Sequence, residues 1–167
     1  VPSGKAAVVP GAGYDIIFLA PEPVWMRGTS ASYGAAHFKK CRDALAADGI
    51  AALHLDTRAL STSRFVTVVR ALLKVFPHAQ FWSTGMYDWV LVGSANPIEA
   101  SASDMLSFFE RSTVARDFAR AGVLSLPEVF PSLLCDEEGL RPWLERSNGE
   151  CTWQSAWRLP QLALGEG

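Results

Sequence analysis

The stretch Tyr14-Asp15-Ile16-Ile17-Phe18-Leu19-Ala20-Pro21 decides the fold class of this chain. Its continuous apolar run, ended by a proline, is typical of a β-strand buried on both faces. Such strands belong mostly to α/β proteins, in which helices cover both sides of a largely parallel sheet. We therefore expect an α/β domain.

Helical and strand patterns alternate downstream of this stretch. A helical pattern runs from Ser32, the expected N-cap, to Gly49, the expected C′ residue. Ile50–Leu55 follows as a second buried strand. Ser61 is expected to cap the next helix, and Pro77 to stop it. This alternation predicts parallel strands joined by helical crossovers.

Two closely spaced strands end this alternating region. They are expected at Ala79–Ser83 and Tyr87–Val92, separated only by Thr84-Gly85-Met86. So short a connection predicts an antiparallel hairpin. The sheet should therefore be mostly parallel, with a C-terminal antiparallel hairpin.

Changes in composition divide the chain into three parts. Residues 1–13 are rich in Gly, Pro and Ala and are expected to form a linker or loop. Residues 14–94 carry the α/β pattern. Residues 95–167 are expected to form a helical C-terminal extension, with helices at Asp104–Ala121 and Glu137–Arg146.

The overall composition excludes several classes of function. Of the 167 residues, 49% are hydrophobic and 19% charged, and the formal net charge is -2. Without a basic stripe we expect no nucleic-acid partner. Three widely separated cysteines favour free thiols and a reducing compartment, and no apolar run is long enough to cross a bilayer. We expect a cytoplasmic location, and no metal site because the three histidines lack ligand spacing.

Short motifs between Tyr14 and Ser94 are shared with one known family. They are Tyr14-Asp15-Ile16-Ile17, Trp25, Gly28, Tyr33, Gly49-Ile50, Val75-Phe76-Pro77-His78 and Asp88-Trp89-Val90-Leu91-Val92-Gly93-Ser94. On these residues the chain resembles the C-terminal half of a spermidine synthase-like (polyamine aminopropyltransferase) domain, and most closely the branch fused to membrane-spanning segments. The resemblance implies a partial Rossmann-like sheet of the type found in S-adenosylmethionine-dependent methyltransferases. It also implies that the nucleotide-binding strands and their Gly-rich turn lie upstream.

The resemblance also locates the positions at which an aminopropyltransferase would do its chemistry. The family's carboxylate, which orients the amine and takes its proton, falls on Ala20, whose methyl group can do neither. Glu22 lies two residues on, on the same face of an extended chain, and is the candidate substitute. The positions that match the substrate pocket are Trp25, His54, Asp56 and Arg58.

These departures lead to two hypotheses about function. In the first, the chain is a degenerate relative without aminopropyltransferase activity that serves as an interaction or regulatory module. Ala20 favours it, and so does Arg58, which would repel a cationic diamine. In the second, it is part of an active aminopropyltransferase-like or methyltransferase-like enzyme. That enzyme would bind decarboxylated S-adenosylmethionine or S-adenosylmethionine through an upstream half, whereas this chain alone should bind no cofactor.

Two other readings of the motifs are weaker. His54 and Asp56 could form a hydrolase triad with Ser61 or Ser63, but the sequence lacks a nucleophile elbow. Gly11-Ala12-Gly13 precedes a strand instead of following one, so we do not expect a dinucleotide-binding loop. Membrane attachment is expected only through segments upstream of this chain, in which case it would be a cytoplasmic domain.

The strand Asp15–Leu19 should need a second neighbour. In the parent fold it lies mid-sheet, and Ile50–Leu55 supplies only one side. An uncovered edge is a template for aggregation, and this strand carries no lysine and no proline. Three segments could cover it: Ala6–Pro10 folded back, a second copy of the chain, or a missing half of the protein. The first is short, so we expect another polypeptide or a second copy to pair there.

Overall fold

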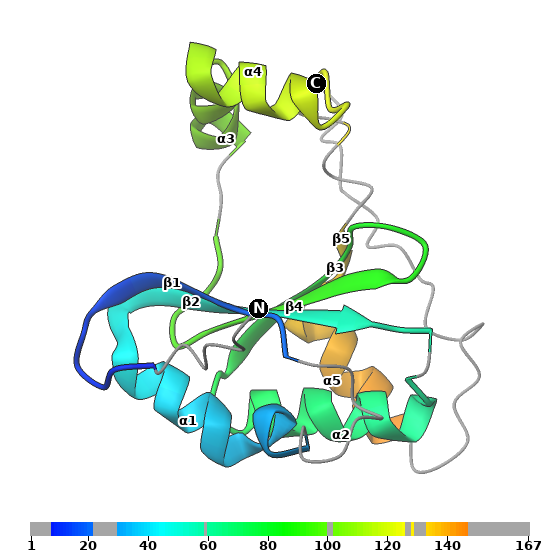
Figure 1. Ribbon diagram of the computed structural model, residues 1–167. Helices are drawn as coiled ribbons and strands as arrows, with labels where there is room; N and C mark the ends of the chain where they lie inside the picture. The colour runs from blue at the N-terminus through cyan, green and yellow to red at the C-terminus, as the bar shows by residue number, and fades with distance from the viewer. Residues whose placement is uncertain are drawn as a thin grey trace, which may run out of the picture.

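A five-stranded sheet forms the centre of the protein (Figure 1). A computed structural model describes residues 8–21, 30–58, 60–99, 102–125, 128 and 133–146. The strand order is β1-β2-β4-β3-β5. The strands are β1 (Tyr14–Leu19), β2 (Leu45–Asp56), β3 (His78–Ser83), β4 (Asp88–Ser94) and β5 (Leu133–Cys135).

The direction of the strands confirms the predicted α/β, Rossmann-like class. β1 and β2 are parallel, and β3 runs the same way, but β4 lies between β2 and β3 and is antiparallel to both. The crossover from β2 places β3 one strand further along the sheet, and β4 then fills the place between β2 and β3. The hairpin therefore lies in the middle of the sheet. β5 adds to the outer edge of β3, again antiparallel.

Helices cover one face of the sheet (Figure 1). On that side lie α1 (Ala35–Ala44), α2 (Thr62–Leu73) and α5 (Glu137–Arg146), with the short 3₁₀ helix η1 (Ser30–Tyr33) before α1. On the other side, α3 (Ala102–Phe109) and α4 (Ser112–Arg120) form a hairpin that stands away from the sheet. The rings of Phe109 and Phe118 hold this hairpin together, with centroids 5.1 Å apart.

The core lies between the sheet and the covering helices. Phe65 of α2 is 2% exposed, and its ring contacts those of Phe81, Trp89 and Trp143. Trp143 belongs to α5, so residues from the region expected to be an extension pack into the core of the α/β part. In the described residues, none of the helices is both long and apolar enough to span a membrane.

β1 differs from the strand expected from its sequence. Its alternate residues Ile17 and Leu19 face the helices and are buried. Tyr14, Ile16 and Phe18 point to the opposite face, where they are 41%, 63% and 61% exposed. The apolar run is thus covered on one face and open on the other. We call this uncovered side of the sheet the open face.

The first helix is shorter than predicted at both ends. Gly34, not Ser32, is the N-cap of α1, and α1 ends at Ala44, so Gly49 is not a helix cap. Gly49 lies inside β2, where a Cβ would come within 2.6 Å of the carbonyl oxygen of Tyr14. The close approach of β1, at a register shift between Tyr14 and Ile16, is what requires glycine there.

Of the remaining helical predictions, two are confirmed and one is wrong in part. The Ser61 hydroxyl accepts a hydrogen bond from the Arg64 amide at 3.4 Å and caps α2, as predicted. α5 spans the predicted Glu137–Arg146. The helix predicted over Asp104–Ala121 is wrong in one respect, because the chain breaks it at Glu110 and Arg111 into α3 and α4. That break allows the two pieces to pack on each other.

Candidate functional site

The predicted site residues that the structure describes gather at the carboxyl ends of β1 and β2. Leu19 pairs with Leu53 across these parallel strands, so the next residues along, Ala20 and His54, are neighbours. Ala20 is exposed and directly follows β1. Glu22 and Trp25, also expected at this site, lie outside the described residues. The site is therefore built mainly on β2 and on the start of β4.

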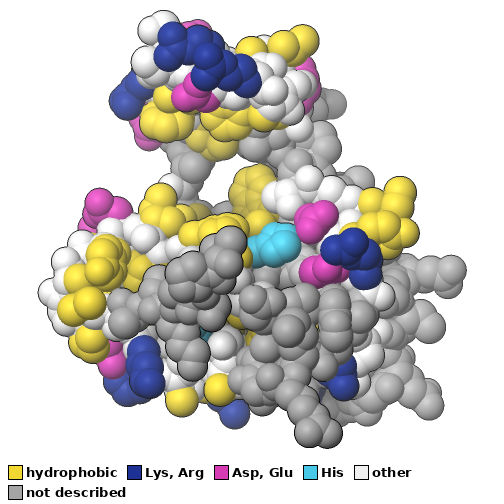
Figure 2. All heavy atoms as spheres, in the orientation of Figure 1, with side chains coloured by type: hydrophobic (Ala, Val, Ile, Leu, Met, Phe, Trp, Pro, Cys, Tyr) yellow, Lys and Arg dark blue, Asp and Glu magenta, His cyan; other side chains and the backbone are white. Residues whose placement is uncertain are grey.

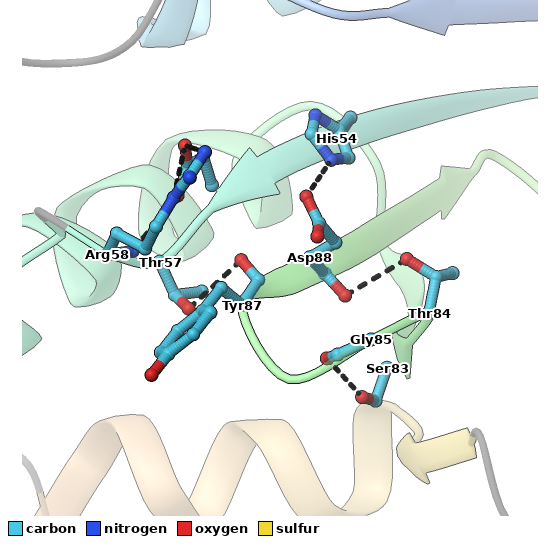
Figure 3. A network of polar contacts seen from close by, with 9 residues as sticks. His54, Thr57, Arg58, Ser83, Thr84, Gly85, Tyr87 and Asp88 are labelled. Carbon is cyan, nitrogen blue, oxygen red and sulfur yellow. Dashed lines mark hydrogen bonds and ion pairs between the residues drawn. The ribbon is translucent and has the colours of Figure 1, made fainter.

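His54 forms a pair with a residue that the sequence did not single out as its partner. Its Nε2 lies 3.0 Å from Oδ1 of Asp88, the first residue of β4 (Figure 3). The two side chains are 33% and 52% exposed. A sequence reading paired His54 with Asp56, because those two are close along the chain. Asp88 is 34 residues away, and only the antiparallel register of β2 and β4 brings it alongside.

The tight connection from β3 to β4 holds Asp88 in place. The backbone carbonyl of Asp88 accepts hydrogen bonds from the amide and the hydroxyl of Thr84, at 2.9 and 3.0 Å. The carbonyl of the preceding Tyr87 accepts two more from the amide and hydroxyl of Thr57, at 2.8 and 3.0 Å. Figure 3 shows these contacts on both sides of the pair. Asp88 is thus fixed to both β2 and the hairpin turn.

Asp56 and Arg58 form an ion pair at the end of β2. Arg58 donates from Nε to both carboxylate oxygens, at 3.0 and 3.1 Å, from Nη2 at 2.6 Å and from its own amide at 3.0 Å. The hydrogen bonds from the Arg58 side chain, and then the one from its amide, lower the pKa of Asp56 to about 2. The same contact raises the pKa of Arg58.

The register of β2 and β4 explains why both carboxylates at this end of the sheet have a partner. Asp56 lies directly opposite Asp88 in the β2–β4 ladder, and like charges in that position repel. Each carboxylate has its own partner, Arg58 for Asp56 and His54 for Asp88. The charge of Arg58 is therefore offset by Asp56. The sequence-based argument that Arg58 repels a cation loses its force in this geometry.

The residues proposed for a triad have other roles. The hydroxyls of Ser61 and Ser63 are 3.1 Å apart, and Ser61 caps α2. The carboxylate that contacts Nε2 of His54 belongs to Asp88 and not to Asp56. Across the parts of the chain that the structure describes, no group of three or more His, Cys, Asp or Glu side chains is placed to hold a metal ion.

The residues present do not fit a nucleotide cofactor. Such a cofactor needs a glycine-rich turn that follows a strand and opens a helix. Gly11 and Gly13 have positive φ of 76° and 70°, but they precede β1. In the sequence, residues 20–29 between β1 and η1 contain one glycine, Gly28, and residues 57–61 between β2 and α2 contain none, so neither stretch has the glycine-rich pattern. We therefore assign no step of any reaction to S-adenosylmethionine on this chain.

Among the solved structures to which the chain is similar, one supports the fold. A probable spermidine synthase from Corynebacterium glutamicum aligns over 89% of this chain and 51% of its own, with 18% identity and a TM-score of 0.50. Human methyltransferase-like protein 13, solved with SAH, aligns over 71% of this chain and 50% of its own (21% identity, TM-score 0.47). Spermidine synthase from Thermotoga maritima aligns over 70% and 42% (17% identity, TM-score 0.43).

These comparisons define how far the similarity reaches. The chain spans about half of the length of the structures it matches. No model of a protein family matches the sequence, and the search of curated proteins finds no relative. The chain thus has a fold similar to that of the Corynebacterium protein, and at this level of identity the likeness concerns the fold alone.

Proposed function

We propose that this chain is a spermidine synthase-like domain that does not transfer aminopropyl groups and acts as an interaction module. Another polypeptide pairs with β1 along Asp15–Leu19. One observation carries the proposal: β1 is the edge strand of the sheet formed by the described residues, and three of its apolar side chains are exposed on the open face.

The edge of β1 supports pairing with a further strand. Among the described residues, β2 is the only strand bonded to β1, which ends the sheet on that side. The described part of the N-terminal segment turns away from the edge of β1. The Ala12 amide donates to the Val9 carbonyl, and the Gly11 amide donates to the carbonyl of Asp43 in α1. The strand has no lysine or proline, and none of the described segments covers its edge, which favours strand addition.

The open face supports a partner that brings more than a strand. A strand added to β1 would satisfy its backbone but leave Ile16 and Phe18 exposed on the sheet face. Hydrophobic side chains gather over the β1 and β2 side of the molecule in Figure 2. Burying a large apolar side chain contributes about 1.5–3 kcal/mol. A partner with an adjacent apolar helix would therefore bind more strongly than a strand alone.

The absence of aminopropyl transfer is argued from one position. Where the family resemblance places a carboxylate, Ala20 offers only a methyl group. Loss of a general base commonly lowers the rate of an enzyme by a factor of roughly 10²–10⁴. We expect no transfer to putrescine even when the domain is completed by a partner.

A second candidate is favoured by the alignment over half of the Corynebacterium structure. In that case the partner at β1 is the nucleotide-binding half of a transferase, which supplies the Gly-rich turn and binds S-adenosylmethionine or its decarboxylated form. The same edge is used in both cases. Membrane segments, if the protein has them, would belong to that other part.

Sedimentation velocity on the isolated chain, over about 1–100 µM, tests the pairing. Without its natural partner, the exposed strand should associate with copies of itself, and Ile16→Lys should shift the chain to monomer. Leu124→Lys is the matched control, because Leu124 is 74% exposed but lies after α4, away from the sheet. A monomeric wild type at all concentrations, or equal effects of the two variants, would refute the proposed module.

A further inference from the structure

His54 lies beside Ala20, the position at which the family resemblance places a carboxylate. Ala20 and His54 are the next residues after the Leu19–Leu53 pair, at the ends of adjacent parallel strands. Side chains alternate between faces, so His54 shares the open face with Phe18 and Ala20. We propose that the His54–Asp88 pair is a proton-accepting site, with His54 Nδ1 as the general base for a water or hydroxyl that attacks an activated ester.

The contact with Asp88 determines which ring nitrogen is available. An ionised carboxylate can only accept hydrogen bonds, so Nε2 of neutral His54 carries the hydrogen at the 3.0 Å contact. The lone pair is then on Nδ1, which lies on the side of the ring away from Asp88 in Figure 3. One third of the His54 side chain is exposed.

The surroundings of the pair favour proton transfer to His54. Asp56 lies on the same face but is held by Arg58 through both oxygens, so it does not compete for the imidazole. Asp88 is the carboxylate left to stabilise the imidazolium that forms. Its carbonyl is fixed by Thr84, and His54 lies in a strand paired on both sides. The backbone of both residues is therefore held in place, which favours a fixed position for the proton acceptor.

The proton transfer is balanced within the site. As the oxygen of the water or hydroxyl attacks the ester carbonyl, its O–H bond breaks, an N–H bond forms at Nδ1, and the electron pair of the O–H bond stays on that oxygen. The C–O bond of the ester then breaks, and the leaving oxygen keeps the electron pair of that bond. The positive imidazolium is then paired with the Asp88 carboxylate. The proton returns to solvent when the products leave. This inference goes beyond the proposed interaction role and does not depend on it.

Hydrolysis of p-nitrophenyl acetate is a suitable probe. Water attacks the ester carbonyl as its proton passes to Nδ1, and p-nitrophenolate leaves. We expect the wild-type chain to release nitrophenolate at least about ten-fold faster than His54→Gln, and Asp88→Asn to be slower than wild type by several-fold. His37→Gln, which changes a histidine on α1, should match wild type. Equal rates for wild type and His54→Gln would overturn the proposal.

Chemical modification of the wild-type chain tests the proposal without depending on whether the variants fold. Diethyl pyrocarbonate should modify His54 in the wild-type chain, located by mass spectrometry of its peptide. Loss of esterase rate should follow modification of His54 in time and not that of His78, whose Nδ1 is held by Glu137 at 2.7 Å. A fully modified His54 with an unchanged rate would contradict the proposal. Self-association is measured separately, so failure here leaves the interaction role intact.

Discussion

Replacement of Phe65 by alanine should lower the free energy of unfolding by about 3–5 kcal/mol. The Phe65 ring is 2% exposed and contacts three aromatic rings, with centroids at 5.1 Å from Phe81, 5.8 Å from Trp89 and 5.5 Å from Trp143. Lost burial accounts for about 1.5–3 kcal/mol. The cavity left behind and the lost ring contacts account for the remainder, about 1.5–2 kcal/mol.

Urea unfolding followed by tryptophan fluorescence and circular dichroism measures this loss. Phe108→Ala is the matched control, because Phe108 is 49% exposed on the α3–α4 hairpin and should cost less than about 1 kcal/mol. Coincident transitions by the two probes would show that unfolding is two-state. A cost below about 1 kcal/mol for Phe65→Ala, or equal costs for both variants, would refute the packing of α2 and α5 on one core.

Three further predictions follow from individual contacts. Gly49→Ala should destabilise the chain and increase amide exchange in β1, because its Cβ would lie 2.6 Å from the Tyr14 oxygen; unchanged exchange would contradict this. Arg58 lowers the pKa of Asp56 to about 2, below its ordinary value near 4, so the pair stabilises the fold above that ordinary value. The stability difference between wild type and Asp56→Asn should therefore be constant at neutral pH and disappear as the pH falls from about 4 to 2, in urea titrations at each pH. Burial raises the pKa of Cys135 to about 12, so iodoacetamide should label it at neutral pH only after unfolding; labelling of the Cys135 peptide in the native chain would argue against that burial.

Local signals predicted the elements whose boundaries depend on local chemistry. The apolar run after Asp15 forms β1, the Ser61 hydroxyl caps α2, and α5 spans the predicted range. Each of these depends on periodicity or on a cap within a few residues. The alternation of strands and helices was enough to predict an α/β sheet.

Long-range contacts explain where sequence reasoning failed. Leu45 to Asp48 continue a helical pattern, yet they begin β2. Tyr14 pairs with Leu45, and the Asn96 side chain donates to Ala47 and Asp48 from the far end of β4. These partners are distant in the sequence, so they leave no local signal. The same holds for the place of β4 inside the sheet.

The sequence predicted some residues of the candidate site but not how all of them are paired. The family resemblance singled out His54, Asp56 and Arg58, and the pairing of Asp56 with Arg58 is local. The partner of His54 was missed, although Asp88 begins a motif that the resemblance included. A signal was present: residues that end one strand and begin the returning strand of a sheet meet at the same edge. Using it required knowing that β4 pairs with β2.

Hydrogen exchange of the β1 amides is the most direct test of the central claim that another polypeptide pairs with this strand. Some of these amides face β2 and should be protected at every concentration, whereas those facing the free edge should exchange quickly in dilute solution. The account predicts that the edge-facing amides become protected as the concentration rises, and that Ile16→Lys abolishes this change. Edge-facing amides that exchange equally fast at all concentrations, in an otherwise folded chain, would contradict it.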